Sequence, residues 1–211
     1  MADLHKKYEV QNLEQENSEH DSFTPDRYEQ FLRHFPSGAN RVLDVGCNTG
    51  RGGLRLKERN PSLEIVGLDC VQSRLDALPD CYAQAAYGLS TRTPFEDRSF
   101  DVVLAGEFLE HLYPSDVDPS LCEFQRVLKI GGRLLMTTPN PQYLKNKFLG
   151  QSVFCTSHLT QHHPRILRLR LQMHGFSRVK LYGSGRVSRH LGRHFPIMAV
   201  YGSYLVAADK A

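Results

Sequence analysis

The sequence predicts an α/β fold in which buried parallel strands alternate with helices. The run Val42–Val45 is apolar apart from Asp44 and leads directly into a turn at Gly46. A second apolar run, Leu63–Leu68, ends on Asp69, 25 residues after Asp44. That spacing equals about one strand–helix–strand unit, and an acid at the end of the second strand is typical of α/β folds that bind nucleosides.

The length of 211 residues and the ordinary composition predict one globular domain. Residues 1–22 are polar and charged, so we expect a mobile or loosely docked arm there and a single domain over residues 23–211. No run approaches the ~18–20 apolar residues of a membrane span, and the N-terminus lacks the apolar core of a signal peptide. These features favour a cytoplasmic location.

Charge is distributed unevenly along the chain. Residues 1–123 contain 12 Lys or Arg and 22 Asp or Glu, whereas residues 124–208 contain 13 Lys or Arg and no acidic residue. The asymmetry predicts either an anionic partner for the C-terminal part or a solvated basic face. The five cysteines are odd in number and widely spaced, so we expect buried free thiols rather than disulfides or a structural zinc site.

The first half of the chain predicts three strands with helices between them. A helix begins at Thr24, where Pro25 suits the first helical position. After the first strand, the glycine turn leads into a second helix over about Gly50–Arg59, which the following Asn-Pro pair ends. A short helix over Val71–Leu78 and a third strand over Tyr82–Leu89 follow.

The second half predicts four more strands and an insertion. A fourth strand follows Asp101, and an amphipathic helix over Asp118–Leu128 ends at a glycine pair. The remaining expected elements are a strand over Arg133–Thr138, an insertion over residues 142–163, a basic helix over Pro164–His174, a strand over Arg178–Leu181 and a final strand over about Ala199–Ala207.

Several stretches resemble class I S-adenosylmethionine-dependent methyltransferases. Val42–Gly50 resembles their first motif, Thr93–Leu104 resembles the signature that precedes strand four, and Gly131–Pro141 resembles the run through strand five. The resemblance covers roughly residues 40–208. It implies a Rossmann-like, doubly wound sheet of seven strands, mostly parallel with the last strand antiparallel, and helices on both faces.

The resemblance also implies S-adenosylmethionine as the cofactor. A dinucleotide fingerprint would require glycines where Asn48 and Arg51 stand, so the turn suits a cofactor without a pyrophosphate. Relatives carry Gly-Asp near the adenine, and this chain has Gly88-Leu89-Ser90 instead, so apolar contact, Ser90 or backbone groups are expected to hold the adenine. The expected cofactor-binding residues are Asp44, Gly46, Cys47, Asn48, Gly50, Asp69, Cys70, Leu89, Ser90 and Glu107.

The segment Glu107-Phe-Leu-Glu110-His111 follows strand four and carries the candidate catalytic residues Glu107, Glu110 and His111. If the segment is helical, the two glutamates share one face. The E-x-x-E-H pattern resembles ubiquinone-pathway O-methyltransferases and small-RNA 2′-O-methyltransferases, in which these residues and a later histidine, here His158, bind a divalent metal. Mg²⁺, Mn²⁺, Fe²⁺ and Co²⁺ all suit such ligands. His162 or His163 could replace His158, and a metal-free site with His111 as general base stays open.

These residues favour O-methyl transfer, because a hydroxyl is a poor nucleophile at neutral pH without a base or a metal. The expected acceptor is a hydroxyl of a sugar, glycolipid or related small or anionic molecule. The alternatives are a ribose 2′-hydroxyl of RNA and, in another class, a catalytically inactive, cofactor-binding regulatory subunit. The absence of the pyrophosphate-binding glycines argues against an NAD-dependent oxidoreductase.

Overall fold

The computed structural model describes residues 2–13, 21–154 and 157–211. Seven strands form one sheet in the order β3-β2-β1-β4-β5-β7-β6. The strands are β1 Arg41–Val45, β2 Glu64–Asp69, β3 Tyr82–Tyr87, β4 Phe100–Gly106, β5 Leu128–Pro139, β6 Phe176–Ser184 and β7 Ser203–Lys210. β7 runs antiparallel to both β5 and β6, while the pairs among β1 to β5 are parallel. The predicted doubly wound fold is confirmed.

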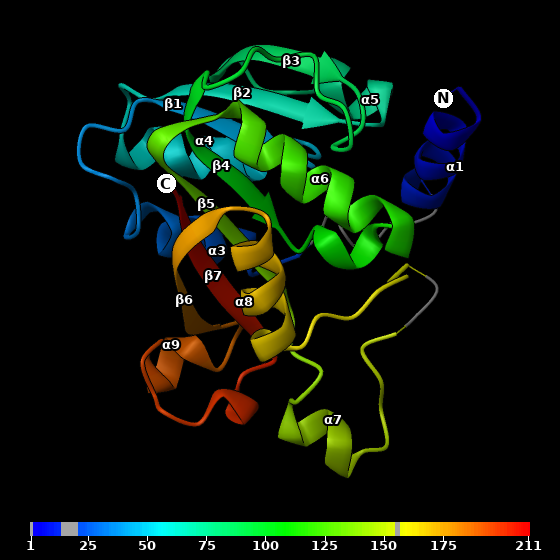
Figure 1. Cartoon of the computed structure of the whole chain (residues 1–211), viewed down its shortest axis with the longest axis vertical. Helices are drawn as coiled ribbons and strands as arrows, with labels where there is room; N and C mark the ends of the chain where they lie inside the picture. The colour runs from blue at the N-terminus through cyan, green and yellow to red at the C-terminus, as the bar shows by residue number, and fades with distance from the viewer. Residues whose placement is uncertain (1, 14–20, 155–156) are drawn as a thin grey trace.

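Helices cover both faces of the sheet (Figure 1). The helices are α1 Ala2–Leu13, α3 Thr24–Leu32, α4 Arg51–Arg59, α5 Gln72–Asp76, α6 Pro114–Val127, α7 Leu144–Phe148, α8 Pro164–Met173 and α9 Ser188–Leu191, with 3-10 turns η1 Leu109–His111 and η2 Met198–Val200. α6 and α8 pack on one face, and α3 and α4 pack on the other. Within the described ranges, none of the helices is long and apolar enough to cross a membrane.

The central strands are buried on both faces because each face carries helices. Side chains of a strand alternate between faces, so neighbouring residues of β1 enter different clusters. Leu43 packs with Phe124 of α6, and Val42 packs with Phe31 of α3 and Leu56 of α4. This alternation fixes the register of the sheet, since a slip by one residue would exchange the two faces. The parallel pairing of β1 with β2 and β4 brings their carboxyl ends to one edge.

Two predicted elements differ from the structure at functionally important places. The expected arm over residues 1–22 contains helix α1, whose Tyr8 is buried against the domain; residues 1 and 14–20 lie outside the described ranges. The segment expected to be helical from Glu107 contains only the 3-10 turn η1, because Glu107 itself has φ of +49°. Glu107 and Glu110 therefore do not share a helical face.

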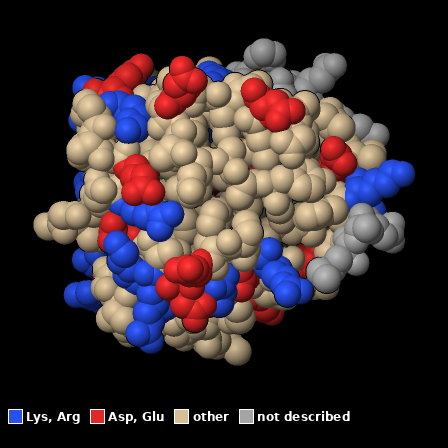
Figure 2. Space-filling model, turned by 90° about the horizontal axis from the view of Figure 1, so that it is seen from above, with Lys and Arg blue, Asp and Glu red and all other residues tan. Residues whose placement is uncertain are grey.

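Part of the basic C-terminal segment is neutralised within the chain. Of its 13 Lys and Arg residues, six pair with an Asp or Glu of the described ranges: Arg126, Lys129, Arg133, Arg170, Arg178 and Arg189. At the end of the molecule formed by β2 and β3, which Figure 2 shows, acidic and basic side chains lie among one another. Somewhat less than half of the basic residues of this segment therefore form internal ion pairs.

Candidate functional site

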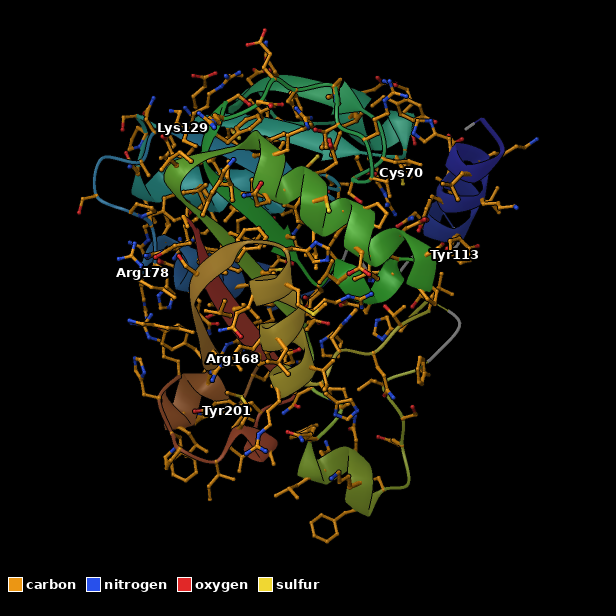
Figure 3. The ribbon with its side chains drawn as sticks, viewed as in Figure 1. Cys70, Tyr113, Lys129, Arg168, Arg178 and Tyr201 are labelled. Carbon is orange, nitrogen blue, oxygen red and sulfur yellow. The ribbon has the colours of Figure 1, made fainter. Side chains whose placement is uncertain are left out.

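A cavity of about 680 Å³ opens at the carboxyl ends of β1, β2 and β4. This volume is within the usual range for a small-molecule site, and its position is where open α/β sheets bind ligands. α1 and α3 contribute the other walls. In Figure 3, the labelled Cys70 and Tyr113 mark the region where α1 docks, since Asn12 donates to the Cys70 sulfur and Tyr8 packs edge-on against Tyr113.

The turn after β1 lines the cavity with Gly46, Cys47 and Asn48, as the sequence predicts. Gly46 has φ of +66°, and a Cβ there would lie 2.8 Å from the ring of Phe108. Its N–H and that of Cys47 donate to the Leu68 carbonyl at the end of β2. A glycine is therefore required at Gly46 both for the turn and for the close packing of the cavity wall.

Asp44, a predicted cofactor-binding residue, does not line the cavity. Its carboxylate is fully buried and accepts hydrogen bonds from the hydroxyls of Tyr28 and Tyr82, both at 2.6 Å. The rings of these tyrosines pack directly over Gly52 and Gly53. Asp44 thus joins α3 and β3 to the glycine turn and acts behind the cavity wall. Gly50 is also outside the lining: it has φ of +77° and packs against Pro79 and Tyr82.

Burial raises the pKa of Asp44 from 3.8 to about 6. The folded chain therefore binds this proton more tightly than the unfolded chain, so the contribution of Asp44 to stability falls as pH rises from about 4 to 6. The Asp44→Asn variant is expected to lack this fall, about 2–3 kcal/mol in the free energy of unfolding. Urea unfolding of both proteins at pH 4, 5, 6 and 7 measures it; parallel curves for the two proteins would contradict the assignment.

Asp69, the last residue of β2, lines the cavity although it is only 5% exposed. One carboxylate oxygen accepts the N–H of Asn48 at 2.9 Å, and the other accepts the N–H of Val71 at 3.0 Å. Burial raises its pKa, and the backbone bond from Asn48 opposes the rise. A carboxylate has about four lone-pair sites, so Asp69 can accept hydroxyl groups of a ligand beside these backbone bonds.

The loop after β3 supplies another wall. Gly88, Leu89, Ser90 and Thr91 all line the cavity, as does Cys70, so the predicted positions Leu89, Ser90 and Cys70 lie together there. The Ser90 hydroxyl is hydrogen-bonded to that of Ser120 at 2.7 Å. Ser90 is therefore held by α6.

Arg27 is a cavity residue that the sequence interpretation missed. It is 7% exposed and pairs with Asp21 at 2.8 Å, while its Nε lies 3.9 Å from Oε1 of Glu107. Gly106 makes room for it, because a Cβ there would lie 2.9 Å from the Arg27 side chain. Both Arg27 Nε and Glu107 Oε1 are buried without a hydrogen-bond partner among the described residues. These two atoms form a charged pair of binding groups beside the glycine turn.

Tyr8 and Asn12 of α1 were also missed, because the polar composition of residues 1–22 predicted an arm. The Tyr8 hydroxyl donates to Asp116 at 2.7 Å and accepts the N–H of Tyr113 at 2.9 Å. The only signal for docking in the sequence of this helix was one aromatic residue, Tyr8, among mostly polar residues. One such residue is too little to distinguish a docked helix from a free one.

Glu110 lies beneath the cavity floor. It is 1% exposed, and Oε2 accepts the hydroxyl of Thr138 at 3.0 Å while Oε1 has no partner among the described residues. Burial, together with the nearby charge of Glu107, raises the pKa of Glu110 well above its usual value. Its backbone carbonyl accepts the N–H groups of Leu159 and Thr160, which fastens the insertion to η1.

Glu110, His111 and His158 form a cluster whose ligand atoms lie within 4.8 Å of one another. His111 Nδ1 is bonded to the Ser157 carbonyl and His158 Nδ1 to the Val153 carbonyl, both at 2.8 Å. Because a carbonyl only accepts, each Nδ1 carries the proton and each Nε2 keeps a free lone pair. Burial lowers the pKa of His111 to about 4, so its ring is neutral at pH 7.

The structure therefore brings together three of the four predicted metal ligands. Glu107 lines the cavity next to the cluster but is not part of it. The alternative His162 is buried and bonded to the Thr160 hydroxyl at 3.0 Å, and His163 is exposed at the start of α8. Neither of these two histidines lines the cavity.

Comparison with known proteins agrees with this geometry. Residues 43–136 match the family model described as a methyltransferase domain. The malonyl-[acyl-carrier protein] O-methyltransferase 1 of Coxiella burnetii is 38% identical over 104 residues, which are 49% of this chain and 35% of that protein. The demethylmenaquinone methyltransferase of Deinococcus radiodurans is 37% identical over 111 residues, 50% of this chain and 44% of that protein. The chain thus spans less than half the length of these relatives.

The fold has close counterparts among solved structures. The crystal structure of a SAM-dependent methyltransferase from Archaeoglobus fulgidus superposes with a TM-score of 0.69 over 89% of this chain and 93% of that one, at 21% identity. At this identity the likeness concerns the fold, and the chemistry has to be argued from the residues of the cavity.

Proposed function

We propose that this chain, residues 43–136 of which match a methyltransferase domain, is a class I S-adenosylmethionine-dependent methyltransferase that transfers the cofactor's methyl group to a hydroxyl of its acceptor. The observation that carries the proposal is the cluster of Glu110, His111 and His158, of which the two histidines line the cavity and Glu110 is buried behind them. A methyltransferase that acted on a strong nucleophile would have no need of a buried carboxylate and two imidazoles with free Nε2 atoms.

The cavity residues suit the parts of S-adenosylmethionine. Asp69 would accept both ribose hydroxyls, and the loop at Leu89 and Ser90 would enclose the adenine. The methionine end carries an ammonium and a carboxylate, which match the carboxylate of Glu107 and the guanidinium of Arg27. Arg27 Nε and Glu107 Oε1 lie 3.9 Å apart without a hydrogen bond to any described residue, which supports this orientation. It directs the sulfonium methyl toward η1 and the cluster.

Methyl transfer then needs alignment and removal of one proton. The acceptor oxygen attacks the methyl carbon as the carbon–sulfur bond breaks, and S-adenosylhomocysteine leaves. The hydroxyl proton passes to a base, for which neutral His111 offers Nε2. The positive charge that the ring acquires would in turn favour the ionised form of the neighbouring Glu110 and so oppose the rise in its pKa.

The same three residues also fit a divalent cation. Their Nδ1 atoms are already held by backbone carbonyls, which is how metal-binding histidines are usually oriented, and Glu110 Oε1 is buried without a partner. Glu110, His111 and His158 would hold the ion, and Mg²⁺, Mn²⁺, Fe²⁺ or Co²⁺ would lower the pKa of the acceptor hydroxyl. Glu107 would remain with the cofactor.

For the acceptor we propose a hydroxyl of a sugar, glycolipid or related small anionic molecule. An RNA ribose is the alternative that the basic C-terminal segment favoured. The internal ion pairs of that segment weaken the case for RNA, since paired cations are less available to phosphates. An inactive regulatory subunit would have no need of the cluster at the cavity edge.

The proposal is tested by measuring S-adenosylhomocysteine formation with a panel of sugar phosphates, glycolipids and short RNAs. Methylation of a hydroxyl compound supports it, and methylation confined to amine or carboxyl compounds in a wider panel would contradict it. A steep loss of acceptor binding between low and moderate salt would identify RNA as the acceptor instead.

The metal is tested separately by titrating Mn²⁺ into the protein and following the free ion by electron paramagnetic resonance. The wild-type protein is expected to bind one ion, while Glu110→Gln and His158→Ala are expected to bind at least about tenfold more weakly. Exposed His163→Ala serves as the matched control and is expected to bind normally. Equal affinity of all variants would exclude this cluster as a metal site and leave His111 as the base.

A further inference from the structure

A second group of chemically reactive side chains lies outside the cavity, where α6 faces the end of α8. Cys122 of α6 is exposed, and its sulfur lies 3.4 Å from Nδ1 of His174. The other ring nitrogen of His174, Nε2, lies 2.8 Å from Oδ1 of Asp118, one turn before Cys122 on α6. Both helices are on the same face of the sheet (Figure 1). None of the three residues lines the cavity.

The carboxylate fixes the tautomer of the histidine. Asp118 accepts two further hydrogen bonds from Arg170, at 2.6 and 2.9 Å, and these bonds hold the pKa of Asp118 well below its usual range. Ionised Asp118 can only accept a hydrogen bond, so the proton of the neutral ring is on Nε2. The lone pair of Nδ1 therefore faces the Cys122 sulfur.

This arrangement has the three parts of an activated nucleophile: a thiol, a base within reach of it, and a third group that orients the base. We propose that Cys122 is a reactive thiol that forms mixed disulfides with small-molecule disulfides, so that it is a modification site independent of methyl transfer. The sequence predicts that most of the cysteines are buried thiols, but among the described cysteines only Cys47 is buried, Cys70 and Cys81 are partly buried and Cys122 is exposed; Cys155 lies outside the described residues.

The other described cysteines lack these features. Burial raises the pKa of Cys47, Cys70 and Cys81, which disfavours the thiolate that such reactions require. Cys47 and Cys70 also line the cavity and would be covered by a bound cofactor. Cys81 is partly exposed and therefore serves as an internal comparison for Cys122.

The reaction balances with the disulfide as the only co-reactant. The Cys122 proton moves to Nδ1 of His174, and the thiolate attacks one sulfur of R–S–S–R. The new sulfur–sulfur bond forms as the old one breaks, and the departing R–S⁻ takes the proton from His174 to leave as R–SH. Cys122 is oxidised to the mixed disulfide, and one R–S group is reduced to the thiol.

The test is site-resolved labelling of the full chain with iodoacetamide and, separately, with oxidised glutathione at pH 7, followed by peptide mass spectrometry. Cys122 is expected to react about tenfold or more faster than Cys81, and His174→Gln and Asp118→Asn are each expected to remove most of that advantage. Arg170→Gln is the matched control: it also breaks the ion pair with Asp118 but keeps the Asp118–His174 contact, so most of the reactivity should remain.

Melting temperatures of all variants establish that they fold. Equal labelling rates of Cys122 and Cys81 in the wild-type protein would overturn the proposal. Fast labelling of Cys122 that is unchanged in His174→Gln and Asp118→Asn would also overturn it, because simple exposure would then explain the rate. Neither result would bear on methyl transfer.

Discussion

Replacing His111 by asparagine is expected to reduce the turnover number by about 10²–10⁴-fold. The asparagine side chain can still donate a hydrogen bond to the Ser157 carbonyl, so the turn at η1 is retained. It offers no imidazole nitrogen, however, and so it can neither take the acceptor proton nor replace His111 at a metal. This loss is expected in both versions of the mechanism.

Cofactor affinity distinguishes this effect from general damage. Because the proposed cofactor contacts are at Asp69, Glu107 and Arg27, calorimetry should show S-adenosylmethionine binding to His111→Asn within about threefold of the wild-type protein, since only peripheral contacts change. His163→Ala, which changes an exposed histidine outside the cavity, should keep full turnover. Turnover by His111→Asn close to that of the wild-type protein would remove His111 from the chemistry.

Replacing Asp69 by alanine is expected to weaken S-adenosylmethionine binding by about 10²-fold or more. Two charge-assisted hydrogen bonds to the ribose are lost, each of about 1.5–3 kcal/mol. The N–H groups of Asn48 and Val71 also lose their acceptor, which loosens the turn that forms the cavity wall. Calorimetric titration with the cofactor measures the change.

Two further variants make this result specific. Asp69→Asn keeps one acceptor oxygen and is expected to bind with intermediate affinity. Asp76→Ala removes an exposed acid of α5 and should bind like the wild-type protein. Unchanged affinity of a folded Asp69→Ala protein would show that the ribose is held elsewhere.

The sequence was sufficient for the sheet because the signals there are local. Apolar runs of strand length, each ended by glycine, asparagine or aspartate, predict β1, β2, β4 and β5, and Asp69 takes its place at the cavity from its position at the end of β2. The residues of the glycine turn follow from the same pattern. The strands and the glycine turn depend on few contacts between residues that are far apart in the sequence.

The position of Asp44 behind the cavity wall could not be predicted, because it depends on contacts that are distant in the sequence. Its partners Tyr28 and Tyr82 come from α3 and β3, 16 residues before it and 38 after it. The periodicity of α3 places Tyr28 on the apolar face but does not show that its hydroxyl reaches a buried carboxylate. An acid at the carboxyl end of a strand therefore has two physical uses, ligand binding and internal bracing, and the choice between them is made by tertiary contacts.

The sequence indicated Glu110, His111 and His158 as candidate ligands but not how they are arranged. Positive φ at Glu107 turns the chain before η1, so Glu107 faces the cavity and Arg27 while Glu110 lies below. His158 reaches the cluster because Leu159 and Thr160 bind the Glu110 carbonyl, and this pairing of an insertion with a strand exit has no sequence signature. The contribution of α1 was missed because its composition is polar.

The central claim is that one cavity holds the methyl donor with its reactive end toward Glu110, His111 and His158. The most direct measurement is a crystal structure of the chain with bound S-adenosylhomocysteine. We expect the ribose hydroxyls on Asp69, the amino-acid end between Glu107 and Arg27, and the sulfur facing η1. A cofactor bound with its ribose away from Asp69, or with its sulfur directed away from His111, would contradict it.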